Sequence, residues 1–273
     1  MGPLDGFCLA AGLGTRMGVL SKALPKPAWT LQNKTLLQWG FDLLDRQGCR
    51  FRAANTHFKS DLLTALHPES ELIHETTLLG SAGWFASVAP RVQEALMVWN
   101  ADAIALEVPF RELRADHLSS GADLTWLLVP HPGGPWTPVW MDDDNRILPT
   151  GQSSRGPYHF VGASIWSPKI AHVLTGGPTQ LQHILHRLHH RGYIMPSLDW
   201  SEIGHPQALI EAGQRWAPQQ EGRSPSNYIH PTATIEGDFH DCIFGPGASL
   251  PRGHQDRRAL WFKDRDRQVR ITL

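Results

Sequence analysis

Hydrophobic and polar positions alternate between two periods along the first two hundred residues. Short apolar runs predict buried strands, and longer runs with helical spacing predict helices between them. The predicted strands are residues 7–10, 52–55, 71–74, 96–99, 124–129 and 158–166, with a hairpin over 139–148. The predicted helices are residues 33–48, 81–95 and 178–191. Because strands alternate with helices, we expect an α/β fold with a mixed, mostly parallel, Rossmann-like sheet sandwiched by helices.

The pattern changes near Trp216. Residues 217–227 are rich in proline, glycine and serine, which is typical of a linker. Beyond them Ile229, Ile235, Ile243 and Leu250 recur about every six to eight residues, with glycine and proline between them. This spacing favours a partial left-handed β-helix, with an irregular β-rich tail as the alternative. The expected division is a first domain over 1–216, a linker over 217–227 and a short tail over 228–273.

Composition narrows the class of protein. The chain has 25 Lys and Arg against 26 Asp and Glu, so it lacks the basic excess of a nucleic-acid or membrane-surface binder. No run approaches the ~20 apolar residues that span a bilayer, and the N-terminus does not resemble a signal peptide. Cys8, Cys49 and Cys242 are odd in number and widely spaced, which fits neither a disulfide framework nor a zinc site and favours small buried hydrophobic residues in a reducing cytoplasm.

A glycine-rich turn follows the first predicted strand. Its glycines allow a polyphosphate to approach the backbone N–H groups, and Arg16 can neutralise phosphate oxygens. Met17 stands where a dinucleotide-binding fingerprint needs glycine, and the chain has no Walker Gly-Lys-Ser/Thr. On the glycines alone, a tight turn without a ligand explains the pattern equally well.

The full run from Gly12 to Pro27 resembles the signature of the sugar nucleotidyltransferases (NDP-sugar pyrophosphorylases), G-x-G-T-R followed by P-K-P. The resemblance implies the nucleotidyltransferase fold, with Arg16 on the leaving phosphates and Lys26 near the α-phosphate. It also implies that the nucleotide is bound by Leu9, Ala10, Ala11, Gly12, Gly14 and Thr15. The chain departs from the family at Gly18-Val19, where Arg-Pro is usual.

Residues 79–83 resemble the family's L-G-T-A-G turn, which lies against the base. The resemblance implies base contacts by Gly80, Ala82 and Gly83, with Glu75 as a hydrogen-bonding partner of the base. The alternative is an ordinary helix start at Ser81.

Two carboxylates are the candidate metal ligands. Asp102 follows Asn100 at the end of a predicted buried strand, where ligands bind in open α/β sheets, and Mg²⁺ takes one or two carboxylates plus phosphate oxygens. Glu202 stands where the family's W-x-D-I-G-T-P segment supplies a second metal ligand, with Asp199 as a rival. The alternatives are that Asp102 caps a turn and that Glu202 is solvated. The resemblance further implies that Asn100 binds the nucleotide and Gly162 the sugar.

Other features carry less chemistry. His183, His186, His189 and His190 fall on the wet side of a predicted helix, so a solvated face is favoured over a metal site. The tail is too short for an acyltransferase site, which leaves packing or contact between copies of the chain as its expected role.

The expected reaction is Mg²⁺-dependent transfer of a nucleotidyl group from an NTP, with UTP favoured, to a sugar 1-phosphate. The alternatives are cytidylyl transfer to a phospho-alcohol such as phosphocholine and a non-catalytic sensor of NDP-sugars.

Overall fold

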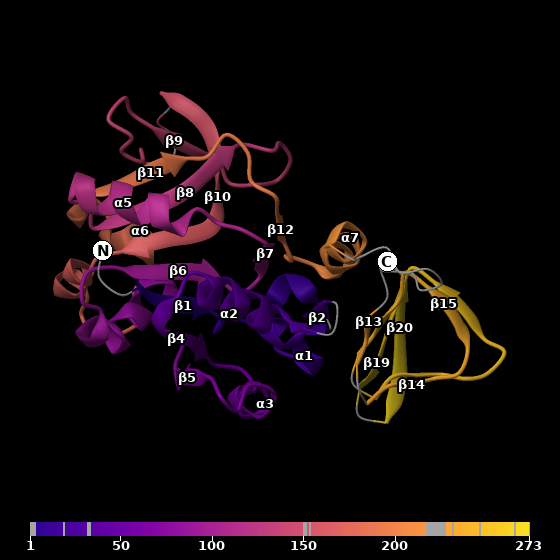
Figure 1. The fold of residues 1–273 in the computed structure, drawn as a ribbon. Coiled ribbons are helices and arrows are strands. Elements are labelled where there is room, and N and C mark those ends of the chain that lie inside the picture. Colours follow the sequence, from indigo (N-terminus) through magenta and orange to yellow (C-terminus); the bar gives the residue numbers. More distant parts are fainter. Residues whose placement is uncertain are drawn as a thin grey trace.

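A twisted central sheet forms the body of the molecule, and a smaller β-rich tail lies to one side (Figure 1). The computed structural model describes residues 4–18, 20–31, 34–149, 152, 154–216, 228–230, 232–245, 247–264 and 266–272. The predicted linker over 217–227 and Val19 of the glycine loop lie outside the described residues. Among the described residues, no helix has the length and apolar character needed to cross a bilayer.

The sheet is mixed and mostly parallel, as predicted. Its strand order is β11-β8-β10-β6-β1-β4-β5, with β9 paired to β10. Only β10 among the strands of this path runs antiparallel to its neighbours β6 and β8 in the described residues. The strands are β1 Leu4–Leu9, β4 Cys49–Thr56, β5 Glu71–His74, β6 Leu96–Asn100, β8 Leu124–Pro130, β9 Val139–Met141, β10 Arg155–Trp166 and β11 His190–Ile194. The mixed α/β fold class is therefore confirmed.

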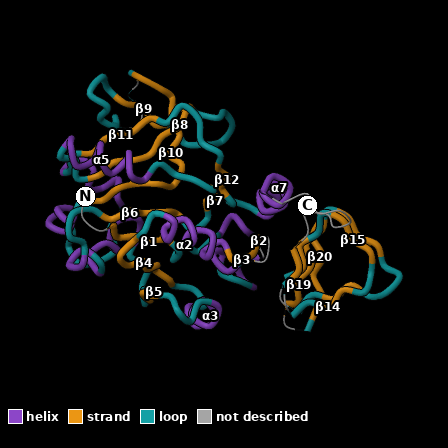
Figure 2. Tube along the Cα trace, in the orientation of Figure 1, coloured by secondary structure: helices purple, strands orange, loops and turns teal. Residues whose placement is uncertain are grey.

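Alternate residues of each strand point to opposite faces of the sheet, and each face has its own core. Phe7 and Val98 pack in one cluster, with Trp84 and Phe85, whereas Cys8 and the neighbouring strand residues pack in the other. The cluster that contains Cys8 also holds the apolar faces of α2, α5 and α7. Figure 2 shows the helices in purple around the strands. The helices are α1 Leu20–Ala23, α2 Leu36–Arg46, α3 Ser60–Leu66, α4 Gly80–Gly83, α5 Phe110–Ser120, α6 Leu181–Ile184 and α7 Pro206–Trp216.

Two predicted helices are wrong in part. The segment 81–95 holds α4 and then 3-10 helices at Trp84–Ser87 and Ala89–Arg91, because Pro90 has no N–H to continue a helix. The segment 178–191 holds α6 and a 3-10 helix at Leu185–Arg187, but its last residues begin β11, which pairs with the edge of β8. In this segment strand pairing outweighed the helical spacing of the apolar residues.

The tail forms short parallel ladders, each strand pairing with one from the next turn of chain. β13 pairs with β16 and β16 with β19, while β14 pairs with β17 and β15 with β18. β20 closes the tail by pairing antiparallel with β19. The strands are β13 Tyr228–Ile229, β14 Thr234–Ile235, β15 Asp238–His240, β16 Ile243–Phe244, β17 Ser249–Leu250, β18 Gln255–Arg257, β19 Ala259–Asp264 and β20 Arg267–Thr272.

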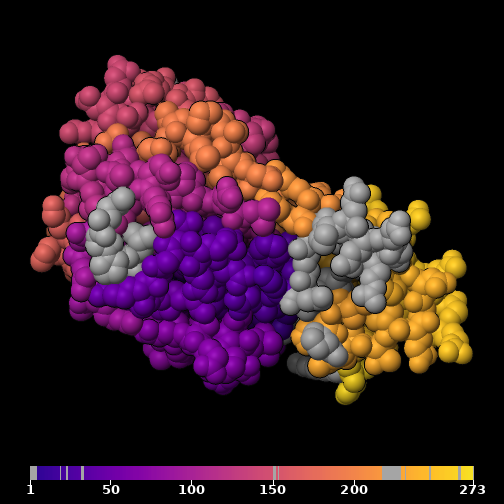
Figure 3. Space-filling model, in the orientation of Figure 1, coloured from indigo at the N-terminus to yellow at the C-terminus, as the bar shows by residue number. Residues whose placement is uncertain are grey.

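The tail packs against the N-terminal part of the chain. Ile243, Leu260 and Phe262 are buried in the same cluster as Met17 and Trp29. Figure 3 shows the tail, in orange and yellow, beside the indigo surface of the N-terminal residues. Packing, one of its two expected roles, is what the structure shows for the tail.

Candidate active site

The central strands of the sheet end together at one edge of a cavity of about 490 Å³. The parallel register places Leu9 of β1 beside Asn55 of β4 and beside Asn100 of β6. Ala10 donates its backbone N–H to Asn55 Oδ1 over 2.7 Å, and Ala101 donates its own to the Leu9 carbonyl over 3.0 Å. The glycine loop is therefore held at the carboxyl edge, where α/β sheets bind ligands.

The predicted nucleotide loop lines this cavity, and its bend depends on Gly14. Gly14 has φ 61° and ψ 31°, a left-handed conformation that favours glycine. A Cβ at this position would lie 3.1 Å from Lys26 Cβ, so the loop also needs glycine to pass close to the lysine. A 3-10 helix, Thr15–Met17, then buries Met17 and leaves Arg16 exposed over the cavity.

Lys26 is brought to the cavity by the proline-rich segment. Pro25 is extended, and Lys26 begins a 3-10 helix, Lys26–Ala28. The lysine side chain is largely buried, with 8% of the residue exposed. Its Nζ lies 2.6 Å from Asp102 Oδ2, so a fixed cation faces the carboxylate at the end of β6.

Glu202 reaches the same place through a two-stranded ladder. β12, Trp200–Glu202, pairs with β7, Ala103–Ala105, so that Glu202 lies beside Ala103. Ile203 donates its N–H to the Asp102 carbonyl over 2.7 Å, and Arg16 Nη2 lies 3.3 Å from Glu202 Oε1. The predicted catalytic residues and both predicted metal ligands therefore meet in one charged array, Arg16, Lys26, Asp102 and Glu202.

The two carboxylates of this array act on each other. Burial raises the pKa of Glu202, the negative charge of Asp102 raises it further, and the cations Arg16 and Lys26 oppose both effects. Glu202 therefore holds a proton more readily than an isolated glutamate does.

This donor set fits Mg²⁺, which takes one or two carboxylates and fills its remaining positions with phosphate and water oxygens. Among the described residues, no group of three or more His, Cys, Asp or Glu could hold an ion by itself. The rival ligand Asp199 is exposed and pairs with Arg215. His183, His186 and His189 are exposed, as predicted for a solvated face, but the prediction is wrong for His190, which is half-buried at the start of β11.

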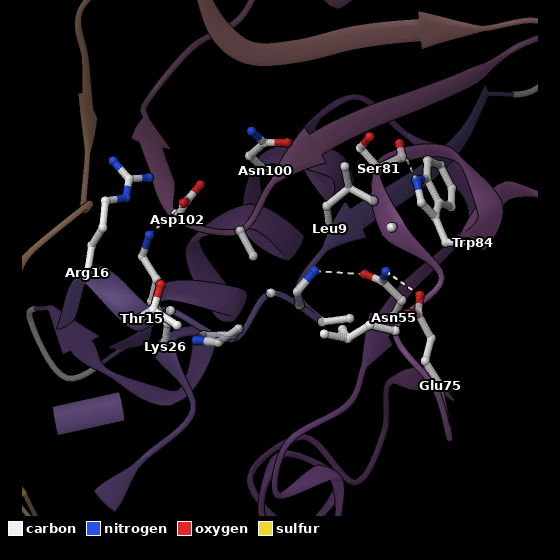
Figure 4. Close-up of a pocket in the computed structure, with 18 of the residues that line it drawn as sticks. Leu9, Thr15, Arg16, Lys26, Asn55, Glu75, Ser81, Trp84, Asn100 and Asp102 are labelled. Atoms are coloured by element: carbon white, nitrogen blue, oxygen red, sulfur yellow. Dashed lines mark hydrogen bonds and ion pairs between the residues drawn. The ribbon is translucent and has the colours of Figure 1, made fainter. Parts of the chain in front are cut away.

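The opposite end of the cavity is formed by the turn before α4. Figure 4 shows Arg16, Lys26 and Asp102 at one end and Ser81, Trp84 and Glu75 at the other. Gly80 and Ser81 line the cavity, as does Gln180 from a segment about a hundred residues later. If the phosphates of a nucleotide contact Arg16 and Lys26 at the charged end of the cavity, its base would lie at this polar end.

The predicted base contacts are partly used inside the protein. Glu75 is 4% exposed, and its carboxylate accepts from Asn55 Nδ2 over 2.7 Å and from the Leu79 N–H over 2.8 Å. The N–H groups of Ala82 and Gly83 both point at the Thr179 carbonyl. The structure therefore gives Glu75 a role in holding Asn55 and the turn.

Some site residues were not foreseen. Asn55 follows the end-of-strand rule and could have been found from its position at the end of a predicted strand. Trp84 and Gln180 carried no signal, since each lies in a segment predicted as regular helix. Gly162 does not line the cavity, but it has φ 88° and a Cβ there would lie 3.0 Å from Asn100 Cβ.

Known proteins provide an independent comparison. The mannose-1-phosphate guanylyltransferase catalytic subunit beta of Dictyostelium discoideum is 25% identical over 66% of this chain, and the alignment spans only 54% of that relative. The N-acetylmuramate alpha-1-phosphate uridylyltransferase of Caulobacter vibrioides is 26% identical over 79% of this chain and 98% of its own length. No family model matches the chain.

Solved structures share the fold. HddC from Yersinia pseudotuberculosis superposes with a TM-score of 0.68 at 19% identity, over 78% of this chain and all of that one. The relatives confirm the predicted resemblance to the sugar nucleotidyltransferases, and the solved structure confirms the fold that it implies.

Proposed function

We propose that this chain transfers a nucleotidyl group from an NTP, with UTP favoured, to a sugar 1-phosphate in a Mg²⁺-dependent reaction. The observation that carries the proposal is the charged array at the end of the glycine loop. Two cations and two carboxylates, brought together from four segments of the chain, lie beside a cavity lined by that loop. The uridylyltransferase of Caulobacter vibrioides, matched over 98% of its length, supports this assignment.

The reaction needs no covalent intermediate with the protein. An oxygen of the sugar 1-phosphate attacks the α-phosphorus in line, the bond to the β-phosphate oxygen breaks, and pyrophosphate leaves. Catalysis of this kind rests on positioning and on stabilising the negative charge of the transition state. Lys26, fixed by Asp102, is placed to neutralise charge at the α-phosphate, and Arg16, which is exposed, to bind the leaving pyrophosphate.

Asp102 and Glu202 would hold the Mg²⁺. When bound, the ion would supply positive charge that offsets the negative charge of the phosphates. Glu202 also pairs with Arg16, and a Cβ at Gly204 would lie 3.1 Å from Arg16 Nη1, so glycine at this position keeps room for the guanidinium.

Substitution of the charged array tests the proposal. Arg16→Ala and Lys26→Ala should each lower turnover by at least about 100-fold, as removal of a transition-state charge partner does, with the fold intact by circular dichroism. Asp102→Ala should abolish Mg²⁺-dependent activity. Near-wild-type turnover of both cation variants would overturn the assignment, and an unchanged metal dependence in Asp102→Ala would remove that residue from the metal site.

A non-catalytic NDP-sugar sensor is the second candidate. The observation that favours it is Glu202, which stands where the family has aspartate. Its side chain is one methylene longer than aspartate and contacts Arg16. A sensor would bind NDP-sugars tightly and release no pyrophosphate with any acceptor.

Two further features belong to the proposal. The parallel ladders of the tail support a partial left-handed β-helix. Cys8 and Cys49 are free cysteines, and burial raises the pKa of both thiols, which supports a reducing, cytoplasmic setting. Contact between copies of the chain through the tail stays a prediction.

A further inference from the structure

A segment far along the chain is fastened to the turn at the polar end of the cavity. Thr179 donates its N–H to the Leu79 carbonyl over 2.8 Å, and its own carbonyl accepts from the Ala82 N–H over 2.9 Å. Leu181 donates its N–H to Ser81 Oγ over 2.7 Å. A Cβ at Gly83 would lie 2.5 Å from the Gly177 carbonyl oxygen, so the two backbones are in direct contact. Residues 177–181 are therefore held against this turn, and Gln180 of the segment lines the cavity.

The hydrogen bonds of Ser81 fix the orientation of the Gln180 amide. A serine hydroxyl has one hydrogen to donate and two lone pairs that accept. Since Ser81 Oγ already accepts from Leu181 N–H, its hydrogen is free to point at Gln180 Oε1, which lies 3.1 Å away. One lone pair of the amide oxygen is thereby used, whereas the amide nitrogen, with its two N–H donors, has no hydrogen-bond partner among the described residues and is the group that we assign to a ligand.

Other polar groups nearby are committed to the protein. Both carboxylate oxygens of Glu75 accept protein N–H groups, and the Ala82 and Gly83 N–H groups point at Thr179. Gln180 lines the cavity, and its Nε2 would lie 2.8 Å from a Cβ at Gly80, so the donor sits directly over the turn. The polar end of the cavity thus offers an oriented side-chain donor.

We propose that Gln180 is a specificity-determining residue that selects nucleotides whose base presents a carbonyl oxygen to the turn. The proposal rests on the proposed function for the identity of the cavity as a nucleotide site. An N–H donor pairs with the O4 carbonyl of uracil or the O6 carbonyl of guanine, whereas the matching positions of cytosine and adenine carry amino groups, which are themselves donors. The selected class is keto nucleotides, UTP or GTP, over amino nucleotides, CTP and ATP.

The test compares dissociation constants of the four NTPs in the presence of Mg²⁺ for the wild type and Gln180→Glu. Glutamate has the shape of glutamine but only accepts hydrogen bonds when ionised, so it reverses the donor. Its charge weakens the binding of every triphosphate, so the readout is the ratio of dissociation constants between CTP and UTP and between ATP and GTP. Gln182→Glu is the matched control, because Gln182 is exposed and does not line the cavity.

We expect the wild type and Gln182→Glu to bind each keto nucleotide at least about tenfold more tightly than its amino counterpart, because the Gln180 donor pairs with a carbonyl oxygen but meets another donor in an amino nucleotide. Gln180→Glu should lower that ratio by about tenfold or more. Ser81→Ala, which frees the amide to rotate, should lower it less. An unchanged ratio in Gln180→Glu, or no preference in the wild type, would overturn the inference.

Binding separates this inference from the proposed function. If keto nucleotides bind selectively through Gln180 but no pyrophosphate is released with any acceptor, the inference stands and the catalytic proposal fails. If pyrophosphate is released but the ratio does not respond to Gln180→Glu, the catalytic proposal stands and the inference fails.

Discussion

The close contact between Gly14 and Lys26 provides a test of how the lysine is positioned. Gly14 lies in the left-handed region, and a Cβ there would come within 3.1 Å of Lys26 Cβ. Gly14→Ala therefore has two effects, a backbone cost and a push on the lysine. Gly121 separates them, because it has φ 65° and ψ 19° at the end of α5 and nothing within 4 Å of its Cβ position.

The two effects differ in size and in the quantity they change. A left-handed alanine costs about 1 kcal/mol, so both Gly14→Ala and Gly121→Ala should lower the melting temperature by about 2–4 °C. Only Gly14→Ala moves Lys26, by a few tenths of an ångström, and the lysine is 8% exposed with its Nζ held by Asp102, so it has little room to recover. Because a misplacement of about 1 Å can cost 100-fold in rate, this smaller shift should lower kcat by about threefold to tenfold.

The assay is steady-state pyrophosphate release at saturating NTP and sugar 1-phosphate, beside a thermal melt of each variant. Combining Gly14→Ala with Lys26→Ala gives a direct check, since a chain without the ammonium group has nothing left to misplace. The double variant should be no slower than Lys26→Ala alone. Wild-type kcat in Gly14→Ala, or an equal loss in Gly121→Ala, would refute the claim that this contact positions Lys26.

Two further predictions concern Glu202 and His159. Glu202→Gln keeps an oxygen for Arg16 but removes a negative charge beside Asp102. The Mg²⁺ concentration for half-maximal activity should therefore rise by about tenfold. An unchanged metal requirement would leave Asp102 as the main ligand. His159 is 5% exposed, and burial, with a contribution from His131, lowers its pKa from 6.5 to about 4. The unfolded chain then binds more protons than the folded chain between these pH values, so folding stability is lost as the pH falls from about 6.5 towards 4, by up to about 3 kcal/mol. In urea titrations at several pH values, His159→Phe should remove this part of the acid sensitivity. The control His183→Gln, at an exposed position, should keep it. Equal acid sensitivity of the two variants would contradict this role of His159.

Much of the fold followed from local pattern because the strands are short, buried and separated by clear breaks. The apolar run at 96–99 could only be a buried strand, and β6 spans Leu96–Asn100. The helical period that ends at Gly48 is α2, whose cap at Thr35 accepts from the Gln38 N–H. The pattern failed at the start of β11, where the spacing of apolar residues predicted a helix but the chain pairs with β8. The local sequence carries no signal for the free edge of a sheet.

The candidate site divides in the same way. Arg16, Lys26 and Asp102 lie in segments with a recognisable order along the chain, and all three line the same cavity. Gln180 could not be predicted, because it reaches the cavity only through hydrogen bonds between segments about a hundred residues apart. The partners of Glu75 were equally hidden, since Asn55 approaches it only when β4 and β5 pair.

The most direct test of nucleotidyl transfer is a matrix of the four NTPs against mannose 1-phosphate, N-acetylmuramate 1-phosphate and phosphocholine, with Mg²⁺, in which pyrophosphate and the nucleotide-linked product are both measured. The account predicts that at least one sugar 1-phosphate gives equal amounts of pyrophosphate and NDP-sugar, and that Lys26→Ala loses both. Product from CTP and phosphocholine alone, or tight binding of an NDP-sugar with no pyrophosphate from any pair, would contradict it.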